Sequence, residues 1–363
     1  MWKVYILYST EKIFSFNYAT KVKYNRFCCK YKSINFCFCY KKTNLDILAK
    51  FEFFLKIISL RLHSDLISSF QMIELSTPTA FNFEQTLRFL SRNEKECLHV
   101  IKNKEIFKVI SFENSLVLFS ITYDSHIQIS IHSENQNQKI VDFVKNYVNH
   151  WFDLEANLPL FYETAQNDEV LASLCQRFHG LRMISMPDLF ESLVWSIIGQ
   201  QINLNFAYSL KKRLVHNFGE KIIFDNENFY SLPTPERLAS LNLEDFQPLQ
   251  FSKSKAKYIL NVSREFAEGN LSQEILKKLT FEEVKEKLVK IKGVGNWTAN
   301  YSMMKSLKNY DAFPVEDVGL HNAVKTQYGL AAKPTIKELN QMAEKWKDWR
   351  GYATFYFWHS LLG

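Results

Sequence analysis

The sequence predicts an α+β protein, in which a small N-terminal domain with an antiparallel β-sheet and helices precedes a larger all-α body. Short apolar runs rich in β-branched and aromatic residues lie between Cys97 and Ser133, and such runs are typical of strands. Beyond the polar loop at residues 133 to 138, apolar residues recur at helical spacing as far as the C-terminus. About 290 residues are enough for two packed cores.

The N-terminal domain is expected at residues 72 to 150. Apolar spacing predicts an amphipathic helix over residues 82 to 93. The runs from Ile106 to Ile110 and from Ser115 to Phe119 predict two strands, because they concentrate residues that suit a pleated, half-buried surface.

The all-α body is expected at residues 151 to 363. Asp188, with Glu191 three residues later, predicts a helix start, because a carboxylate can accept hydrogen bonds from the unpaired amides of a first turn. Asn203 predicts the start of the next helix, because its side-chain amide oxygen can accept such a hydrogen bond as well. Apolar residues from Ile336 to Trp346 predict a late helix.

A glycine turn between two helices is the most informative local feature. Thr280 followed by Glu283 is a capping box that begins the first helix, and Gly293 and Gly295 end it. The second helix then begins with uncovered amides, which can hold a phosphate together with the helix dipole. The pattern favours a DNA or nucleotide backbone as the ligand, although a single Gly-x-Gly turn is weak evidence.

Residues 1 to 71 differ in composition from the rest of the chain. They contain neither Gly nor Pro, although average usage would place roughly five and about three to four there. Charges interrupt their most apolar part, Ile47 to Leu62, so it does not predict a bilayer crossing. We expect a doubtful extension that is disordered or read from a misplaced start, with Met72 as the natural start. A basic DNA-binding arm and a targeting peptide are the alternatives.

The positive charge of the chain is concentrated in that first segment. Residues 1 to 71 carry 12 Lys and Arg against 4 Asp and Glu, which leaves 33 basic and 34 acidic residues in the remainder. Affinity for DNA must therefore come from local basic patches. The candidates are Lys211, Lys212, Arg213, Lys253, Lys255, Lys290 and Lys292, and ordinary solvated helix faces are the alternative interpretation.

Four segments in order carry a resemblance to a known family. They are Phe81-Asn82-Phe83 with Phe89-Leu90, then Ile-Gly-Gln-Gln-Ile at 198 to 202, then Gly-Val-Gly-Asn-Trp-Thr-Ala-Asn-Tyr at 293 to 301 with Asp317 about one helix later, and Gly-Tyr-Ala-Thr-Phe-Tyr-Phe-Trp at 351 to 358. Together they resemble the helix-hairpin-helix (HhH-GPD) DNA glycosylases, and the DNA-3-methyladenine glycosylase II branch in particular. The resemblance spans about residues 72 to 363, and it implies a helix-hairpin-helix glycosylase body.

The resemblance implies that Asp317 is the catalytic carboxylate. Breaking the bond between base and sugar builds positive charge on the deoxyribose, which a nearby carboxylate stabilises. Position alone favours another role for Asp317, as the N-cap of a helix that begins at Val318. The two roles are compatible. Asp311 comes too early to match the family, and Glu316 faces another direction.

The resemblance also implies a pocket for an extruded base, formed by Trp297, Tyr301, Trp358, Gln200 and Phe89. Such a pocket suits alkylated purines, because a cationic base stacks on an aromatic face with a gain of about 0.5 to 2 kcal/mol. Core packing is the alternative for any aromatic residue in a chain with 31 Phe.

Relatives that also cleave the DNA strand carry a Lys at the position of Trp297. An indole cannot form an imine with the sugar, so the resemblance implies hydrolysis in one step without strand cleavage. Gln201 matches the residue that wedges into the gap left by the base. The DNA backbone contacts match Lys292, Gly293, Val294, Gly295 and Asn296.

The leading hypothesis is therefore a monofunctional alkylbase glycosylase. A glycosylase for an oxidised or deaminated base and a catalytically silent DNA-binding module are the alternatives. The expected partner is double-stranded DNA with damaged bases, and we expect a monomer in the bacterial cytoplasm, bound to the nucleoid when acting, and no membrane. No cofactor or metal is expected, and no iron-sulfur cluster either, because no Cys follows Cys175. A monovalent cation between hairpin and phosphate is left open.

Overall fold

The structure, a computed structural model, describes residues 72 to 113, 115 to 133 and 136 to 362 in full, and three strands in the first segment. These strands are β1 (Val4–Leu7), β2 (Asn25–Tyr31) and β3 (Ile34–Tyr40), in an antiparallel sheet of order β1-β3-β2. Whether this segment belongs to the natural protein stays a prediction. Residues 70 to 363 form a separate compact unit, and the predicted boundary at residue 150 within it also stays a prediction.

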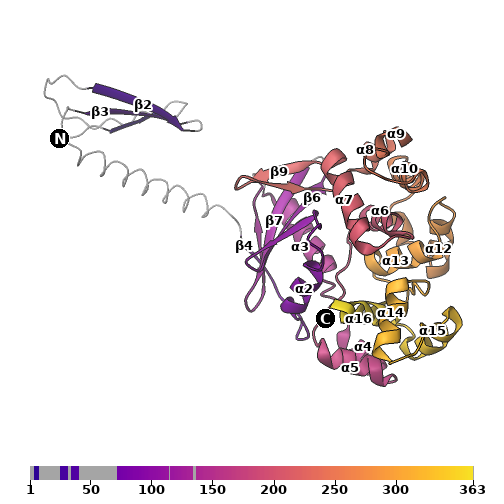
Figure 1. Cartoon of the computed structure of the whole chain (residues 1–363). Coiled ribbons are helices and arrows are strands. Elements are labelled where there is room, and N and C mark those ends of the chain that lie inside the picture. The colour runs from indigo at the N-terminus through magenta and orange to yellow at the C-terminus, as the bar shows by residue number, and fades with distance from the viewer. Residues whose placement is uncertain are drawn as a thin grey trace. The chain divides into compact units, whose positions relative to one another are not determined.

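A five-stranded antiparallel sheet opens this second unit (Figure 1), as predicted. Its strands are β4 (Met72–Leu75), β5 (His99–Lys102), β6 (Glu105–Phe112), β7 (Ser115–Tyr123) and β8 (Ile127–Ile131), in the order β4-β8-β7-β6-β5. The two predicted strands are β6 and β7, paired with Val109 opposite Leu118. Both strands are almost continuously apolar in their middle because both faces of the sheet are covered there.

Helices α2 (Phe83–Leu90) and α3 (Gln138–Trp151) pack on the sheet and lie between it and the helical body (Figure 1). The predicted helix at 82 to 93 is α2, and Asn82 caps it by accepting from the amide of Gln85. Phe83 stacks on Tyr123 of β7 with ring centroids 5.3 Å apart. This contact fixes α2 against the sheet.

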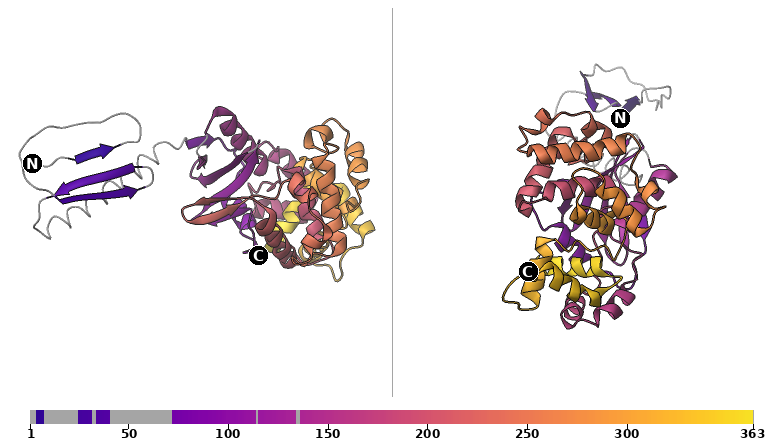
Figure 2. Two further views of the ribbon diagram at one scale, coloured as in Figure 1. Left: turned by 90° about the horizontal axis from the view of Figure 1, so that it is seen from above. Right: turned by 90° about the vertical axis from the view of Figure 1, so that its right-hand side faces the viewer.

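The rest of the unit is mainly helical, and Figure 2 shows its helices gathered on one side of the sheet. Asp188 and Asn203 cap helices as predicted. The helices are α4 (Leu158–Ala165), α5 (Glu169–Arg177), α6 (Leu189–Gly199), α7 (Leu204–Phe218), α8 (Pro235–Ala239), α9 (Leu243–Phe246), α10 (Lys253–Ala267), α11 (Gln273–Leu276), α12 (Phe281–Val289), α13 (Asn296–Ser306), α14 (Val318–Gln327), α15 (Ile336–Ala343) and α16 (Arg350–His359), with short 3-10 turns η1 (Glu344–Trp346) and η2 (Ser360–Leu362).

The prediction of uninterrupted helical structure after residue 138 is wrong at one place. Strands β9 (Lys221–Phe224) and β10 (Glu227–Tyr230) form a hairpin between α7 and α8. Its two turn residues, Asp225 and Asn226, both have positive φ, at 49° and 61°. Tight hairpin turns need such angles, and Asp and Asn tolerate them well. The sequence therefore held a turn signal that helical spacing obscured.

The length of the chain allows two packed cores, and the structure places most of the buried side chains in one of them. One cluster of buried side chains runs from Ile73 in β4 to Phe357 in α16 and includes residues of the sheet, α3 and the helical body. The sheet and the helices thus share the main core of the described unit, and two smaller clusters are separate from it, one that includes Phe107 and Phe229 and one that includes Cys97 and Val215. This shared core fixes the sheet domain against the helices that carry the candidate site.

Candidate active site and DNA interface

The hairpin between α12 and α13 has the predicted construction. Thr280 and Glu283 form the capping box that begins α12. Gly293 has φ +109°, a left-handed value that disfavours any side chain, and a Cβ there would lie 2.3 Å from Cγ of Tyr258. Asn261 donates to the carbonyl of Lys292 at 3.0 Å. Helix α10 thus supports the hairpin by close packing and by a hydrogen bond.

The N-terminus of α13 is open for an anion. Gly295 is its N-cap, and among the described residues no side chain caps the helix. The amides of its first turn, beginning at Asn296, therefore face outward with the positive end of the helix dipole. Lys292 is exposed beside them. This end of α13 lines a groove of about 840 Å³ that extends to Gln201.

The predicted wedge loop lies across this groove from the hairpin, between α6 and α7. Gln201 is exposed and has φ +56°, a strained backbone angle for a residue other than Gly. Gln200 donates its amide to the carbonyl of Gly293 at 2.9 Å and to the hydroxyl of Thr298 at 3.0 Å. Gln200 thus ties the wedge loop to the hairpin. Its predicted contact with a base and the wedge role of Gln201 stay predictions.

Two lysines predicted to contact phosphate do something else, so that expectation is wrong for them. Lys255 is buried, and its amine donates to the carbonyls of Ile197, Ile198 and Gln200 at 2.5 to 3.0 Å. It thereby satisfies the open C-terminus of α6, and burial lowers its pKa to about 8. Lys211 is 6% exposed and is paired with Glu96 at 2.6 Å.

Asp317 is held by three N–H donors from three parts of the chain. It is the N-cap of α14, as its position predicted, and Oδ1 accepts from the amide of Leu320 at 2.7 Å. Oδ1 also accepts from the indole Nε1 of Trp358 at 2.8 Å. Oδ2 accepts from the indole Nε1 of Trp297 at 3.1 Å. Both carboxylate oxygens therefore act as acceptors in a fixed orientation.

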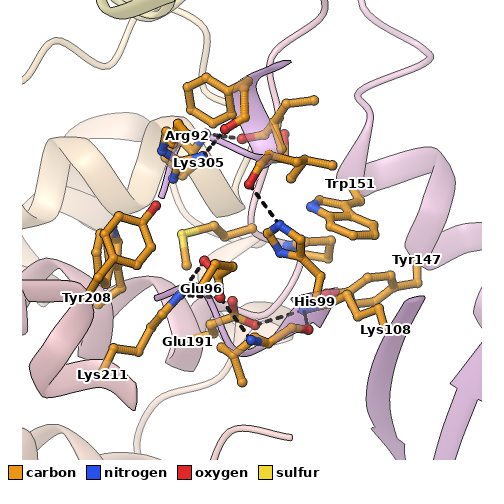
Figure 3. Close-up of a pocket in the computed structure, with 18 of the residues that line it drawn as sticks. Arg92, Glu96, His99, Lys108, Tyr147, Trp151, Glu191, Tyr208, Lys211 and Lys305 are labelled. Carbon is orange, nitrogen blue, oxygen red and sulfur yellow. Dashed lines mark hydrogen bonds and ion pairs between the residues drawn. The ribbon is translucent and has the colours of Figure 1, made fainter. Parts of the chain in front are cut away.

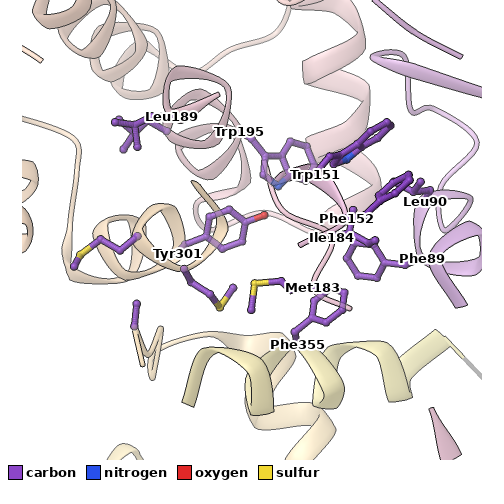
Figure 4. Close-up of a cluster of buried hydrophobic side chains, with 14 of the residues drawn as sticks. Phe89, Leu90, Trp151, Phe152, Met183, Ile184, Leu189, Trp195, Tyr301 and Phe355 are labelled. Carbon is purple, nitrogen blue, oxygen red and sulfur yellow. The ribbon is translucent and has the colours of Figure 1, made fainter. Parts of the chain in front are cut away.

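The aromatic residues predicted for the base pocket surround this carboxylate. The ring of Tyr301 lies 5.5 Å from that of Trp297 and 5.9 Å from that of Trp358. The ring of Phe89, the fourth predicted aromatic residue, packs instead against that of Phe355, with ring centroids 4.7 Å apart (Figure 4). The structure thus brings Asp317 and three of the predicted aromatic residues together.

Sequence reasoning missed the residues that hold the loop of Asp317 in place. Arg350 pairs with Asp311 through Nε at 2.7 Å and through a second nitrogen. His321, which no motif had assigned, lies with Nε2 2.8 Å from the carbonyl of Val315 and Nδ1 2.7 Å from that of Pro334. Its signal in the sequence is only its place one turn after Asp317.

Gly319 was also missed. A Cβ at this position would lie 2.9 Å from Oδ1 of Asp317 and 3.4 Å from Nε1 of Trp358. A side chain would therefore crowd the hydrogen bond between indole and carboxylate. The glycine is needed for space rather than for its backbone angle.

Comparison with known proteins decides the family. Residues 194–348 match the family described as "HhH-GPD superfamily base excision DNA repair protein", and residues 67–193 match "8-oxoguanine DNA glycosylase, N-terminal domain". The DNA-3-methyladenine glycosylase of Bacillus subtilis is 37% identical over 294 residues, which are 80% of this chain and 97% of that protein. The chain belongs to the HhH-GPD superfamily. The predicted resemblance is thereby confirmed.

Solved structures agree with this assignment. The 3-methyladenine DNA-glycosylase from Archaeoglobus fulgidus superimposes with a TM-score of 0.70 at 25% identity, covering 79% of this chain and 97% of that one. The 8-oxoguanine glycosylase/lyase of Clostridium acetobutylicum, at 21% identity and a TM-score of 0.62, covers 80% and 97% and shares the fold. The solved structures that share this fold thus include one that is named a glycosylase and one that is named a glycosylase/lyase.

Two further observations concern ligands and membranes. Within the described residues, no group of three or more His, Cys, Asp or Glu side chains is placed to hold a metal ion. The expectations about cofactors and a monovalent cation stay predictions. In the described part of the chain, no helix combines the length and apolarity that a bilayer crossing requires.

Proposed function

We propose that this HhH-GPD protein is a monofunctional alkylpurine-DNA glycosylase. It would extrude bases of the 3-methyladenine and 7-methylguanine type from double-stranded DNA and hydrolyse the N-glycosidic bond. One observation carries the proposal. Hydrogen bonds from two indole N–H groups and from a backbone amide in the first turn of α14 hold the carboxylate of Asp317 in a fixed orientation beside the hairpin groove. The names of the relatives from Bacillus subtilis and Archaeoglobus fulgidus support the substrate class.

The proposed reaction depends on charge at the sugar. As the base leaves, the deoxyribose becomes cationic, and a carboxylate already held in orientation stabilises that charge without rearranging during the reaction. Asp317 meets this requirement because its three N–H partners fix both oxygens. It would stabilise the sugar cation or orient the attacking water. An alkylated purine needs no strong general acid, because its own positive charge makes it a good leaving group.

The hairpin and the aromatic side chains supply positioning. A phosphate of the damaged strand would bind at the open N-terminus of α13, which begins one residue before Trp297. The base would stack among Trp297, Tyr301 and Trp358, whose faces attract a cationic purine. The phosphate contact and two of the three aromatic contacts to the base thus come from α13, and the third comes from α16. This arrangement couples phosphate binding to placement of the sugar at Asp317.

We further propose that the protein does not cleave the DNA strand. The indole of Trp297 occupies the position where strand-cleaving relatives carry an amine, and its Nε1–H is directed at Asp317. An indole nitrogen is not nucleophilic, so no imine with the sugar forms there. We propose a monomer that needs no cofactor and acts on DNA in the bacterial cytoplasm.

The decisive experiment uses DNA methylated with dimethyl sulfate. The full chain should release methylated purines that chromatography identifies, and it should leave abasic sites that break only after hot alkali. Borohydride added during the reaction should trap no covalent adduct between protein and DNA. A trapped adduct that disappears when one particular Lys is replaced would overturn the monofunctional assignment. Release of oxidised or deaminated bases alone would replace the substrate class, and tight DNA binding with no release would indicate a silent module.

A further inference from the structure

The sheet domain and the helical body line a small cavity of about 50 Å³, and Tyr301 is part of its wall (Figure 3). Its charged side chains are Arg92, Glu96, Lys108, Glu191, Lys211 and Lys305. Four of these are paired with one another, Lys211 with Glu96 at 2.6 Å and Lys108 with Glu191 at 3.8 Å. Arg92 and Lys305 lie together at one side of the cavity, away from these pairs (Figure 3). They are the charged groups that ion pairing does not explain.

Lys305 is unusual because it is buried and poorly supplied with acceptors. Its side chain is 3% exposed, and its amine lies 5.4 Å from the ring centroid of Phe89 and 5.0 Å from that of Phe355. The carbonyl of Ile184 is its one hydrogen-bond acceptor among the described residues. Burial, together with the charge of Arg92, lowers the pKa of Lys305 well below its usual value. A neutral amine has two N–H donors and an ammonium three, so at least one stays free in either state.

Lys255 shows what a structural lysine does in this protein. Its amine donates to three backbone carbonyls at the end of α6, which accounts for every N–H of an ammonium. Lys305 has one such partner among the described residues. A buried N–H without an acceptor costs free energy, so packing alone does not explain an amine at this place. A ligand with an acceptor group would explain it.

The position of Lys305 on α13 indicates which part of a base it would meet. Trp297, Tyr301 and Lys305 follow one another at four-residue steps, so they lie on one side of the helix. Lys305 is therefore about 12 Å along the axis from Trp297, which contacts Asp317. A purine that lies along α13 with its N9 at Asp317 directs its opposite edge, which carries the substituent at C6, toward the end of the helix where Lys305 lies. Helical side chains lean toward the N-terminus, which brings the amine back toward Tyr301.

We propose that Lys305 is a specificity-determining residue that donates a hydrogen bond to the 6-oxo group of an extruded purine. It would favour lesions such as 7-methylguanine and hypoxanthine over 6-amino lesions such as 3-methyladenine. This inference rests on the proposed glycosylase function. The lone pair of a neutral Lys305 amine could accept from a 6-amino group. The guanidinium of Arg92 beside it has only donors, however, so donors outnumber acceptors on this side of the cavity and favour a 6-oxo group. The cavity is smaller than a purine, so the proposal requires the long side chains of Arg92 and Met186 in its wall to move as the base enters.

The test is a competition in a single reaction. DNA methylated with dimethyl sulfate carries both 7-methylguanine and 3-methyladenine, and chromatography measures the release of each by the same enzyme molecules. Lys305→Met keeps an unbranched side chain of similar size but removes the donor. We expect the ratio of 7-methylguanine to 3-methyladenine release to fall ~10-fold, because a site built to bind a polar group loses discrimination with its donor. A loss of folded protein lowers both releases equally and leaves the ratio unchanged.

Matched variants separate the donor from other effects. Lys305→Gln keeps N–H donors and should restore part of the ratio, whereas Lys337→Met, at an exposed position on α15, should leave it at the wild-type value. A ratio unchanged in Lys305→Met, or one that moves only in Arg92→Met, would overturn the inference.

A second measurement needs no variant. The wild-type enzyme should release hypoxanthine ~10-fold faster than unsubstituted purine, which lacks the 6-oxo group, from otherwise identical oligonucleotides. Equal rates would contradict the inference. A wild-type protein that releases no purine from any of these substrates would instead contradict the proposed function itself.

Discussion

Replacing Asp317 by Asn should nearly abolish base release while most of the fold and the DNA affinity survive. The change removes the charge but keeps the shape. If the carboxylate stabilises the cationic sugar, the rate should fall at least ~100-fold, which is about 2.7 kcal/mol of transition-state stabilisation. The assay is single-turnover release of methylated purines at saturating enzyme. This condition separates the chemical step from DNA binding.

The structure also predicts a smaller effect on stability. Both oxygens of Asp317 accept from N–H groups, so the new NH₂ group must face a donor. Oδ2 has a single partner, and the amide should therefore direct its NH₂ group at the indole of Trp297. One hydrogen bond is lost and two donors confront each other, at a cost of about 1 to 3 kcal/mol. The thermal midpoint should fall by a few degrees.

Asp311→Asn is the matched control for this prediction. Asp311 is an acidic residue six positions earlier in the same loop, and it pairs with Arg350 rather than facing the pocket. Asn at this position keeps an oxygen that accepts from Nε of Arg350, so the loop should keep its place and base release should stay within a few-fold of the wild-type rate. The reasoning fails if Asp317→Asn releases bases within a few-fold of wild type with a normal melting profile, because Asp317 would then serve only as the cap of α14.

Two further predictions concern the hairpin and a buried ion pair. Gly293→Ala should weaken binding to DNA with an abasic analogue at least ~10-fold in fluorescence anisotropy, because the left-handed φ and the contact with Tyr258 force the hairpin to shift. The control is Gly269→Ala, at φ +74° with no described atom within 4 Å. Equal DNA affinities of the two variants would contradict the argument. Burial raises the pKa of Glu96, but the ammonium of Lys211 and hydrogen bonds outweigh it and hold that pKa far below its usual range. The stabilisation by the pair is therefore fully present well above the unfolded pKa of about 4.3, and it should be lost progressively as the pH falls through that value toward the lower pKa of the folded state. The Glu96→Gln protein should be less stable than wild type at pH 7 by about 3 to 5 kcal/mol. Between pH 5 and 3, its melting temperature should fall less steeply than that of wild type. Parallel curves of melting temperature against pH would show that the pair has no such role.

Helix starts and the hairpin could be predicted from the sequence because their interactions are local. Asn82, Asp188, Asn203 and Thr280 each accept from an amide two or three residues later, so a short window contains both partners. The β9–β10 hairpin was missed although its turn is also local, because regular helical spacing on both sides dominated the interpretation.

In the candidate site, too, local interactions could be predicted from the sequence and long-range ones could not. The sequence by itself determined that Asp317 caps a helix, and the family resemblance added that Trp297 and Trp358 belong near a base. Only the tertiary structure decided that both indoles donate to that carboxylate, because these partners are 20 and 41 residues away from it in the chain. Lys211, which pairs with a residue 115 positions away, was misread as a DNA contact for the same reason. A charged residue shows its burial and its partner only after packing brings distant segments together, and no local pattern records that outcome.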